Sequence, residues 1–300
     1  MLIDKITEIF VKIDDFYIEF ESSIQNHLLE SGKAQRIRKS KLSESEIMTI
    51  CISFHLGCFS NFKHYYIHYI QAHLDKEFPQ KLSYNRFIEV QQKVLVPLLI
   101  YLKLYGFGEC TGISFMDSTC LKVCHNKRIY QHKVFKGIAQ RGKSTMGWFY
   151  GFKLHLIINE KGEILNFSLS KGNVDDRNRT VIKELSKNIG GKFFADKGYI
   201  SQSLFEFLST QNIQLITGIR KNMKNKLVNI YDKIMLRKRA VIETVNDQLK
   251  NIAQIEHSRH RSLMNFLINT IAAITAYCFA DKKPSINLPQ KDRQIALNSI

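Results

Sequence analysis

The stretch WFYGFKLHLIIN (residues 148–159), followed directly by EKGE (160–163) and ILNFSLS (164–170), carries the clearest strand signal in the chain. Aromatic and β-branched residues dominate both outer segments, and the first of them partly alternates between apolar and other residues, as strands do. EKGE contains a glycine and predicts a turn. We therefore expect two antiparallel strands joined as a hairpin.

The segments on either side of this hairpin extend the predicted sheet. Upstream, ISFMDST (113–119) is short, apolar and preceded by glycines, which predicts a buried strand that ends at Asp117. Downstream, the pattern predicts a loop, a helix, a strand, a helix and a strand, at residues 172–178, 180–188, 192–195, 201–210 and 213–219. Two long helices follow, at about 236–253 and 261–280. This order predicts an α/β fold with a mixed five-stranded, ribonuclease-H-like sheet flanked by helices.

The first 108 residues are predicted to be all-helical. Apolar residues repeat at helical spacing up to about Leu29, and Ser43 and Glu46 form a capping box before the apolar run 47–59. Further helical patterns cover residues 61–74 and 84–105, and a basic link spans 31–41. We expect three parts, a helical N-terminal domain, a catalytic domain and a polar tail, at 1–108, 109–282 and 283–300. The helical domain either helps to recognise DNA ends, in the manner of a helix-turn-helix domain, or is a purely structural cap.

The distribution of charge indicates a partner. The chain has 44 Lys+Arg and 27 Asp+Glu, a net charge of +17, of which residues 1–108 contribute only +1. A basic surface can serve solubility alone. An excess confined to one region, however, indicates a polyanion, most often nucleic acid.

No apolar run approaches the roughly 20 residues that cross a bilayer, and acids in the N-terminal segment argue against a signal peptide. We therefore expect a cytoplasmic protein, with no membrane partner and free thiols at its six cysteines. Two cysteine and histidine sets admit a zinc interpretation. The first, Cys51, His55 and Cys58, has the spacing of a packed helix face, and the second is Cys120, Cys124, His125 and His132.

Three acidic residues are candidates for catalysis. Asp117 and Asp196 each follow an apolar run, in FMDST and FFADKGY, and α/β folds place their sites at such strand ends. Glu243 lies on a late helix, with Arg239 one turn before it and Lys250 two turns after it. Clustered carboxylates can bind hard cations, and two cations can clamp the oxygens of a phosphodiester. Most aspartates at strand ends, however, only cap the next turn.

FMDST, FFADKGY and the pattern R-x-x-x-E-x-x-x-x-x-x-K resemble the DDE transposases of bacterial insertion sequences. The run from 124 to 177, CHNKRIY to NVDDR, is similar to the insertion sequence 982 family in particular, as are ITEIFVKIDDFYIEFE (6–21) and SYNRF (83–87). The resemblance implies that Asp117, Asp196 and Glu243 are the catalytic and metal-binding residues, and that two Mg²⁺ (or Mn²⁺) ions serve as cofactors. It also implies cleavage of the element's ends and transfer of their 3′-hydroxyl strands into target DNA. Synapsis of two ends implies at least a homodimer.

The expected DNA contacts come from the basic segment 122–143 and from the two cations near Glu243. They are Lys122, Lys127, Arg128, Lys133, Lys136, Arg141, Lys143, Arg239 and Lys250. Such cations grip phosphates, although the two near Glu243 could also be plain helix ion pairs. Related families carry a tyrosine three residues before the arginine, where this chain has Leu236.

Several alternatives stay open. Asp175 and Asp176 are rival carboxylates, in a loop that suits helix capping. We expect His155 to be a core or sheet-surface residue and Trp148 to be core, although an aromatic there could stack on a displaced base. The rival functions are a metal-dependent nuclease without strand transfer and an inactive, non-enzymatic DNA-binding protein.

Overall fold

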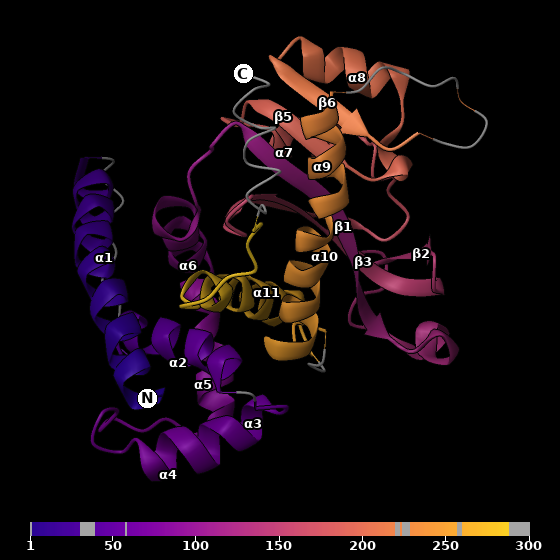
Figure 1. The fold of residues 1–300 in the computed structure, drawn as a ribbon. Coiled ribbons are helices and arrows are strands. Elements are labelled where there is room, and N and C mark those ends of the chain that lie inside the picture. The colour runs from indigo at the N-terminus through magenta and orange to yellow at the C-terminus, as the bar shows by residue number, and fades with distance from the viewer. Residues whose placement is uncertain are drawn as a thin grey trace. The chain divides into compact units, whose positions relative to one another are not determined.

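The computed structural model describes residues 2–30, 40–57, 59–219, 223, 229–256 and 260–287. They divide into two compact units, Met1–Gly106 with Leu249–Ala280, and Phe107–Gln248 with Asp281–Ile300 (Figure 1). We call them the helical unit and the sheet unit. Residues 249–280, predicted as part of domain 109–282, thus pack with the N-terminal helices. The reason is that α11 (Leu263–Cys278) carries no charged residue, and a helix apolar all round must be covered.

The helical unit confirms the predicted helical N-terminal region. Its elements are α1 (Leu2–Glu30), α2 (Glu44–Leu56), α3 (Phe62–His64), η1 (Tyr65–Ile70), α4 (Gln71–His73), α5 (Tyr84–Val90), η2 (Gln91–Val94), α6 (Leu95–Tyr101), η3 (Leu102–Gly106) and α11, with η6 (Gln248–Ile252) entering it. The single helix predicted over 84–105 is broken into α, 3₁₀ and π turns. Pro97 lies at the third position of α6 and has no N–H for the preceding turn, which favours a new helix start there.

The capping box at the start of α2 is confirmed. The Glu46 N–H donates to Ser43 Oγ (3.1 Å), and the Ser43 N–H donates to the Glu46 carboxylate (2.7 Å). Cys51 and His55 lie in the core, and His55 Nδ1 lies 2.6 Å from the Ala253 carbonyl oxygen. Core packing thus accounts for these two residues. Cys58 lies outside the described residues, as do 31–39 of the predicted link and 288–300 of the predicted tail.

The sheet unit contains a mixed sheet. Its strands are β1 (Ile113–Cys124), β2 (Gln140–Ser144), β3 (Gly147–Asn159), β4 (Ile164–Lys171), β5 (Gly191–Ala195) and β6 (Ile213–Thr217). The strand order is β2-β3-β1-β5-β6, and β4 also pairs with β3. β3 is antiparallel to β1, β2 and β4, whereas β1, β5 and β6 run parallel. β2 and β4 pair with different halves of β3, which is therefore the long central strand of the antiparallel part.

The predicted β3–β4 hairpin and the strands at 192–195 and 213–219 are confirmed, but two details of the sheet were wrong. It has six described strands rather than five. The extra strand, β2, is the polar edge sequence QRGKS, which has no apolar alternation to reveal it. β1 also continues to Cys124, so Asp117 lies within the strand. The antiparallel ladder with β3 extends beyond the last parallel pair with β5 and keeps the chain extended.

Helices flank the sheet (Figure 1). They are α7 (Arg179–Leu185), α8 (Gln202–Ser209), α9 (Ile230–Lys238) and α10 (Ala240–Asp247), with short turns η4 (Asn126–Gln131) and η5 (Lys197–Tyr199). The apolar cluster beneath α7 and α8 includes Met116, Ile157 and Phe193 from three strands. The long helix predicted at 236–253 is divided among α9, α10 and η6. Within the described part of the chain, no helix is both long and apolar enough to span a membrane.

Candidate active site

Two predicted acids meet where the parallel strands separate. The β1–β5 pairing ends at Met116 opposite Ala195, so the next residue on each chain is Asp117 and Asp196. Parallel register places these two positions side by side. Asp196 leaves its strand, as predicted, and its carboxylate accepts the Gly198 N–H at the start of η5. The end of one parallel pairing thus delivers two carboxylates to one place.

Helix α10 brings the third acid to β1. Asn246 is buried and its Nδ2 donates to Asp117 Oδ2 (3.1 Å), which fixes this helix face against the strand. Glu243 lies three residues earlier, on the same face. Arg239 Nη2 lies 2.6 Å from Glu243 Oε1, so the predicted one-turn ion pair forms. Asn246, which no sequence pattern singled out, is the direct link between the helix and Asp117.

The three carboxylates lie close enough to influence one another. Burial raises the pKa of Asp117 from 3.8 to about 6; Arg239 opposes this shift, and the charges of Asp196 and Glu243 add to it. Burial also raises the pKa of the Tyr199 hydroxyl well above 10, and the charges of Asp117 and Asp176 increase this shift. The charged form of a buried carboxyl group beside two other carboxylates is unfavourable, because it loses hydration and is repelled by the like charges.

The side chains at this cluster fit a divalent cation by their chemistry. Carboxylate oxygens are the donors that Mg²⁺ and Mn²⁺ prefer. Asn246 Oδ1 is buried beside Asp117 and has no hydrogen-bond partner, which leaves a further oxygen donor in place. A cation would offset the repulsion from Asp196 and Glu243, which adds to the effect of burial on the Asp117 pKa. Among the described residues, however, no group of three or more His, Cys, Asp or Glu side chains is already gathered as a metal site.

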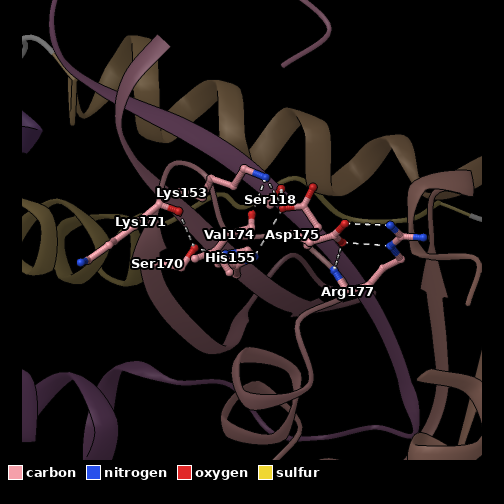
Figure 2. A network of polar contacts seen from close by, with 9 residues as sticks. Ser118, Lys153, His155, Ser170, Lys171, Val174, Asp175 and Arg177 are labelled. Carbon is pink, nitrogen blue, oxygen red and sulfur yellow. Dashed lines mark hydrogen bonds and ion pairs between the residues drawn. The ribbon is translucent and has the colours of Figure 1, made fainter. Parts of the chain in front are cut away.

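A polar network lies beside the cluster (Figure 2). Ser118, the neighbour of Asp117, donates its hydroxyl to Asp176 Oδ1 (2.9 Å), and Lys153 Nζ lies 3.0 Å from the same oxygen. Lys153 also donates to the Val174 carbonyl oxygen (2.9 Å). The loop carrying Asp176 is thus tied to β1 and β3, next to a predicted catalytic residue. Nothing in the sequence spacing pointed to this link.

The two rival aspartates have different partners, and neither caps α7. Asp175 accepts from Arg177 Nε (2.9 Å) and Nη2 (2.7 Å), and these hydrogen bonds lower the pKa of its carboxyl well below 3.8. Asn178, instead, caps α7 by accepting the Thr180 N–H (3.0 Å). The capping expectation for Asp175 and Asp176 was therefore wrong, because the helix begins later than their positions suggest.

His155 is fully buried, in agreement with the expected core position. Its Nε2 lies 2.8 Å from Ser170 Oγ, and its Nδ1 lies 4.0 Å from Asp176 Oδ1 (Figure 2). Burial lowers its pKa to about 4, although the Asp176 charge opposes the shift. The histidine is therefore neutral at pH 7, and it is packed in the core beside Ser170 and Asp176.

The predicted DNA-contacting cations are distributed over both units. Seven of them are exposed on β1, η4, the following loop and β2, namely Lys122, Lys127, Arg128, Lys133, Lys136, Arg141 and Lys143. Arg239 faces Glu243, as described above. Lys250 belongs to the helical unit, where its Nζ lies 3.4 Å from the Glu256 carboxylate.

The second cysteine and histidine set has other contacts. His125 Nδ1 accepts the Lys127 N–H (3.3 Å) and caps η4, while His132 stacks on Phe135 with ring centroids 5.5 Å apart. Trp148 was expected in the core, but the residue is 55% exposed. Successive side chains of a strand point to opposite faces, so Phe149 is buried on one face of β3 while Trp148, near the start of the strand, is exposed on the other.

Comparison with known proteins identifies the family. Residues 107–263, more than half of the chain, match the family model described as "Transposase DDE domain". No curated protein matches. A solved structure of a piggyBac transposase synaptic complex with hairpin DNA is similar at 11% identity and a TM-score of 0.46, over 97% of this chain and 76% of that chain. The matched residues include Asp117, Asp196 and Glu243, and the chain belongs to the DDE transposase family.

Proposed function

We propose that this protein is the transposase of a bacterial insertion sequence of the 982 family, which cleaves the element's ends and transfers the freed 3′-hydroxyl strands into target DNA. The family match over 107–263 supports the reaction class. The main structural observation that supports one shared site for the three acids is the Asn246–Asp117 hydrogen bond (3.1 Å). It fastens the helix of Glu243 to the strand pair of Asp117 and Asp196.

We further assign the sheet to the ribonuclease-H-like fold. An antiparallel group, β4-β3-β1, is followed by the parallel strands β5 and β6, and this is the order expected from the sequence. In this assignment the first acid belongs to β1, the second follows β5, and the third comes from a later helix. The extra strand β2 enlarges the antiparallel side without changing the order of the others.

The chain's own residues would prepare the reaction in distinct ways. Asp117, Asp196 and Glu243 would hold two divalent cations, which when bound make water or a 3′-hydroxyl a better nucleophile and offset charge on the phosphate. Asn246 orients the Asp117 carboxylate. Arg239 Nη2 lies 2.6 Å from Glu243 Oε1. If Glu243 held a divalent cation instead, the Arg239 guanidinium would be available to contact a phosphate oxygen of the DNA.

The exposed cations of residues 122–143 would follow the DNA backbone, because phosphate contacts position a protein on DNA without reading sequence. We assign the helical unit to recognition of the element's ends. We also propose that two copies act together to synapse two ends, in the cytoplasm at the nucleoid.

The test uses a donor plasmid that carries the coding region with its natural flanking DNA. Wild-type protein with Mg²⁺ is expected to cut at fixed positions outside the gene, and a pre-cut 3′-hydroxyl end is expected to be joined to a second plasmid. Glu243→Gln should bind the same DNA but lose both reactions, while Glu184→Gln, at an exposed acid on α7, should keep both.

The outcomes separate the rivals. Cutting without joining would identify a nuclease. Binding with no Mg²⁺-dependent cutting by wild-type protein would identify an inactive DNA-binding protein. Undiminished cutting by Glu243→Gln would overturn the assignment of this acid.

A further inference from the structure

The tip of the β2–β3 hairpin presents an aromatic ring to solvent. Trp148 is the single tryptophan of the chain and is 55% exposed, next to Met146, which is 91% exposed. Arg141 and Lys143 lie over the indole, at 5.5 Å and 5.8 Å from the ring centroid. Apolar side chains of this size are normally covered where they serve packing alone. We call Arg141, Lys143, Met146 and Trp148 the hairpin platform.

The local structure holds this platform in place. Ser144 Oγ donates to the Gly147 carbonyl oxygen (3.1 Å) and accepts the Met146 N–H (3.2 Å), which closes the turn. Gly147 has φ +109°, a backbone region that favours glycine. Asn126 Nδ2 donates to the Trp148 carbonyl oxygen (2.7 Å) and ties β3 to η4. The ordered hairpin therefore holds the Trp148 ring in place, so little conformational entropy remains to be lost when a ligand binds.

The charge around the platform selects its ligand. Residues 118–159 contain eight Lys and Arg and no Asp or Glu, and the seven cations between 122 and 143 are exposed. Two of those cations are in the platform itself. A flat aromatic face beside phosphate-binding cations is the combination that proteins use for single-stranded nucleic acid, where bases stack on rings and the backbone contacts the cations.

We propose that the hairpin platform binds an unpaired nucleotide of DNA, with its base stacked on Trp148 and its phosphates on Arg141 and Lys143. This deepens the proposed function, on which it rests for the identity of the nucleic acid. A base within an intact duplex is stacked on both faces, so only an unpaired or displaced base offers a free face to the ring. The platform therefore distinguishes melted or single-stranded DNA from duplex.

The position of the platform limits which nucleotide it can bind. Asp117 is opposite Leu156 on β3, and Trp148 lies eight residues before Leu156 on the same strand. At ~3.3 Å per strand residue, Trp148 and Leu156 are about 26 Å apart along β3, which corresponds to about eight nucleotides of duplex at ~3.4 Å each. The bound base is therefore well away from the cut phosphate, on the DNA that continues past the site.

The single tryptophan makes a direct experiment possible. Full-length protein is titrated with a 12-nucleotide oligo(dT) in EDTA, and then with a blunt duplex, while the tryptophan emission and the anisotropy of labelled DNA are recorded. We expect oligo(dT) to quench Trp148 at saturation and the duplex to leave the emission largely unchanged. Trp148→Ala should weaken oligo(dT) binding by roughly 5- to 100-fold, with a much smaller effect on duplex.

Matched variants separate stacking from charge and from folding. Trp148→Phe, which keeps an aromatic face, should bind oligo(dT) within a few-fold of wild type. Arg141→Ala should weaken both DNA forms alike, because both carry the same phosphates. Phe205→Ala, on α8 beside the opposite edge strand β6, should change neither. If Trp148→Ala does not fold, the wild-type quenching and the Trp148→Phe affinity decide.

The inference is overturned if oligo(dT) saturates the wild-type protein without quenching, or if folded Trp148→Ala binds it as tightly as wild type. Plasmid cleavage in Mg²⁺ distinguishes this failure from failure of the proposed function. Cleavage without quenching would overturn the platform alone. Quenching without cleavage would support the platform and overturn the transposase assignment.

Discussion

The Asp117 carboxylate is buried, which makes its charged form unfavourable in the folded protein. The residue sits within a strand, its carboxylate accepts from Asn246, and burial raises its pKa to about 6 in the presence of two nearby acids. Such a site lowers the stability of the metal-free protein, because the charged form is disfavoured on folding. Sites selected for chemistry commonly sacrifice stability in this manner.

Asp117→Asn should therefore stabilise the metal-free protein at neutral pH. The folded pKa, about 6, lies above the usual 3.8, so stability falls as pH rises between these values and the loss is complete above pH 6. Asparagine avoids this loss, which amounts to at most about 3 kcal/mol at 1.36 kcal/mol per unit. Urea unfolding in EDTA at pH 7.5 and pH 4 measures it. A variant no more stable than wild type at pH 7.5 would contradict the account.

Lys153 and Asp176 should depend on each other. Their charged atoms lie 3.0 Å apart, and the Lys153 side chain is only 12% exposed, so neither charge is fully hydrated. A double-mutant cycle with Lys153→Met and Asp176→Asn should give a coupling free energy of about 1–2 kcal/mol. Unfolding by urea supplies the four stabilities. Additive effects would show that the contact contributes nothing.

At the scale of elements, the sequence predicted correctly those features that depend on a few neighbouring residues. The Ser43–Glu46 box and the β3–β4 hairpin were both predicted, because cap, turn and strand patterns are local. β2 was missed since its residues lack an apolar face. The hydrogen bonds that join Asn246 to Asp117 and Asp176 to Ser118 were missed for another reason: these partners lie 129 and 58 residues apart in the sequence, beyond any spacing argument.

The capping box gives a prediction for the helical unit. Ser43→Ala removes the acceptor for the Glu46 N–H and should cost about 1 kcal/mol of unfolding free energy. Ser60→Ala is the matched control, since Ser60 is exposed and outside any helix. Thermal unfolding of both variants, followed by circular dichroism, makes the comparison. Equal midpoints for the two would contradict a stabilising cap.

For the whole molecule, the sequence predicted the DDE transposase family, since that resemblance depends on motifs spread over a long stretch of the chain. The sequence could not assign residues 249–280 to a unit, because an apolar helix pattern shows that the helix is buried but not which other elements cover it. The burial of Trp148 was misjudged at this scale as well. Its neighbours are apolar, but only the completed hairpin shows which side of the strand faces solvent.

Acid should destabilise the protein through three buried histidines. Burial lowers the pKa values of His55, His155 and His260 to about 4 from 6.5. A depressed folded pKa means that the stability present above pH 6.5 is lost as pH falls toward 4. From pH 7 to pH 5, His55 alone should account for about 2 kcal/mol. His55→Gln should flatten the pH dependence of urea unfolding by that amount, and an unchanged slope would contradict a neutral His55.

The central claim is that Asp117, Asp196 and Glu243 form one catalytic site. The most direct test is the Mg²⁺-dependent rate of first-strand cutting on the donor plasmid, measured for three single variants and for the triple variant Asp117→Asn, Asp196→Asn, Glu243→Gln. Residues that act as a unit are strongly non-additive. Each single change should lower the rate by at least roughly 1,000-fold, and the triple variant should be no slower than the slowest single. Losses that multiply, or one variant that cuts at the wild-type rate, would contradict a shared site.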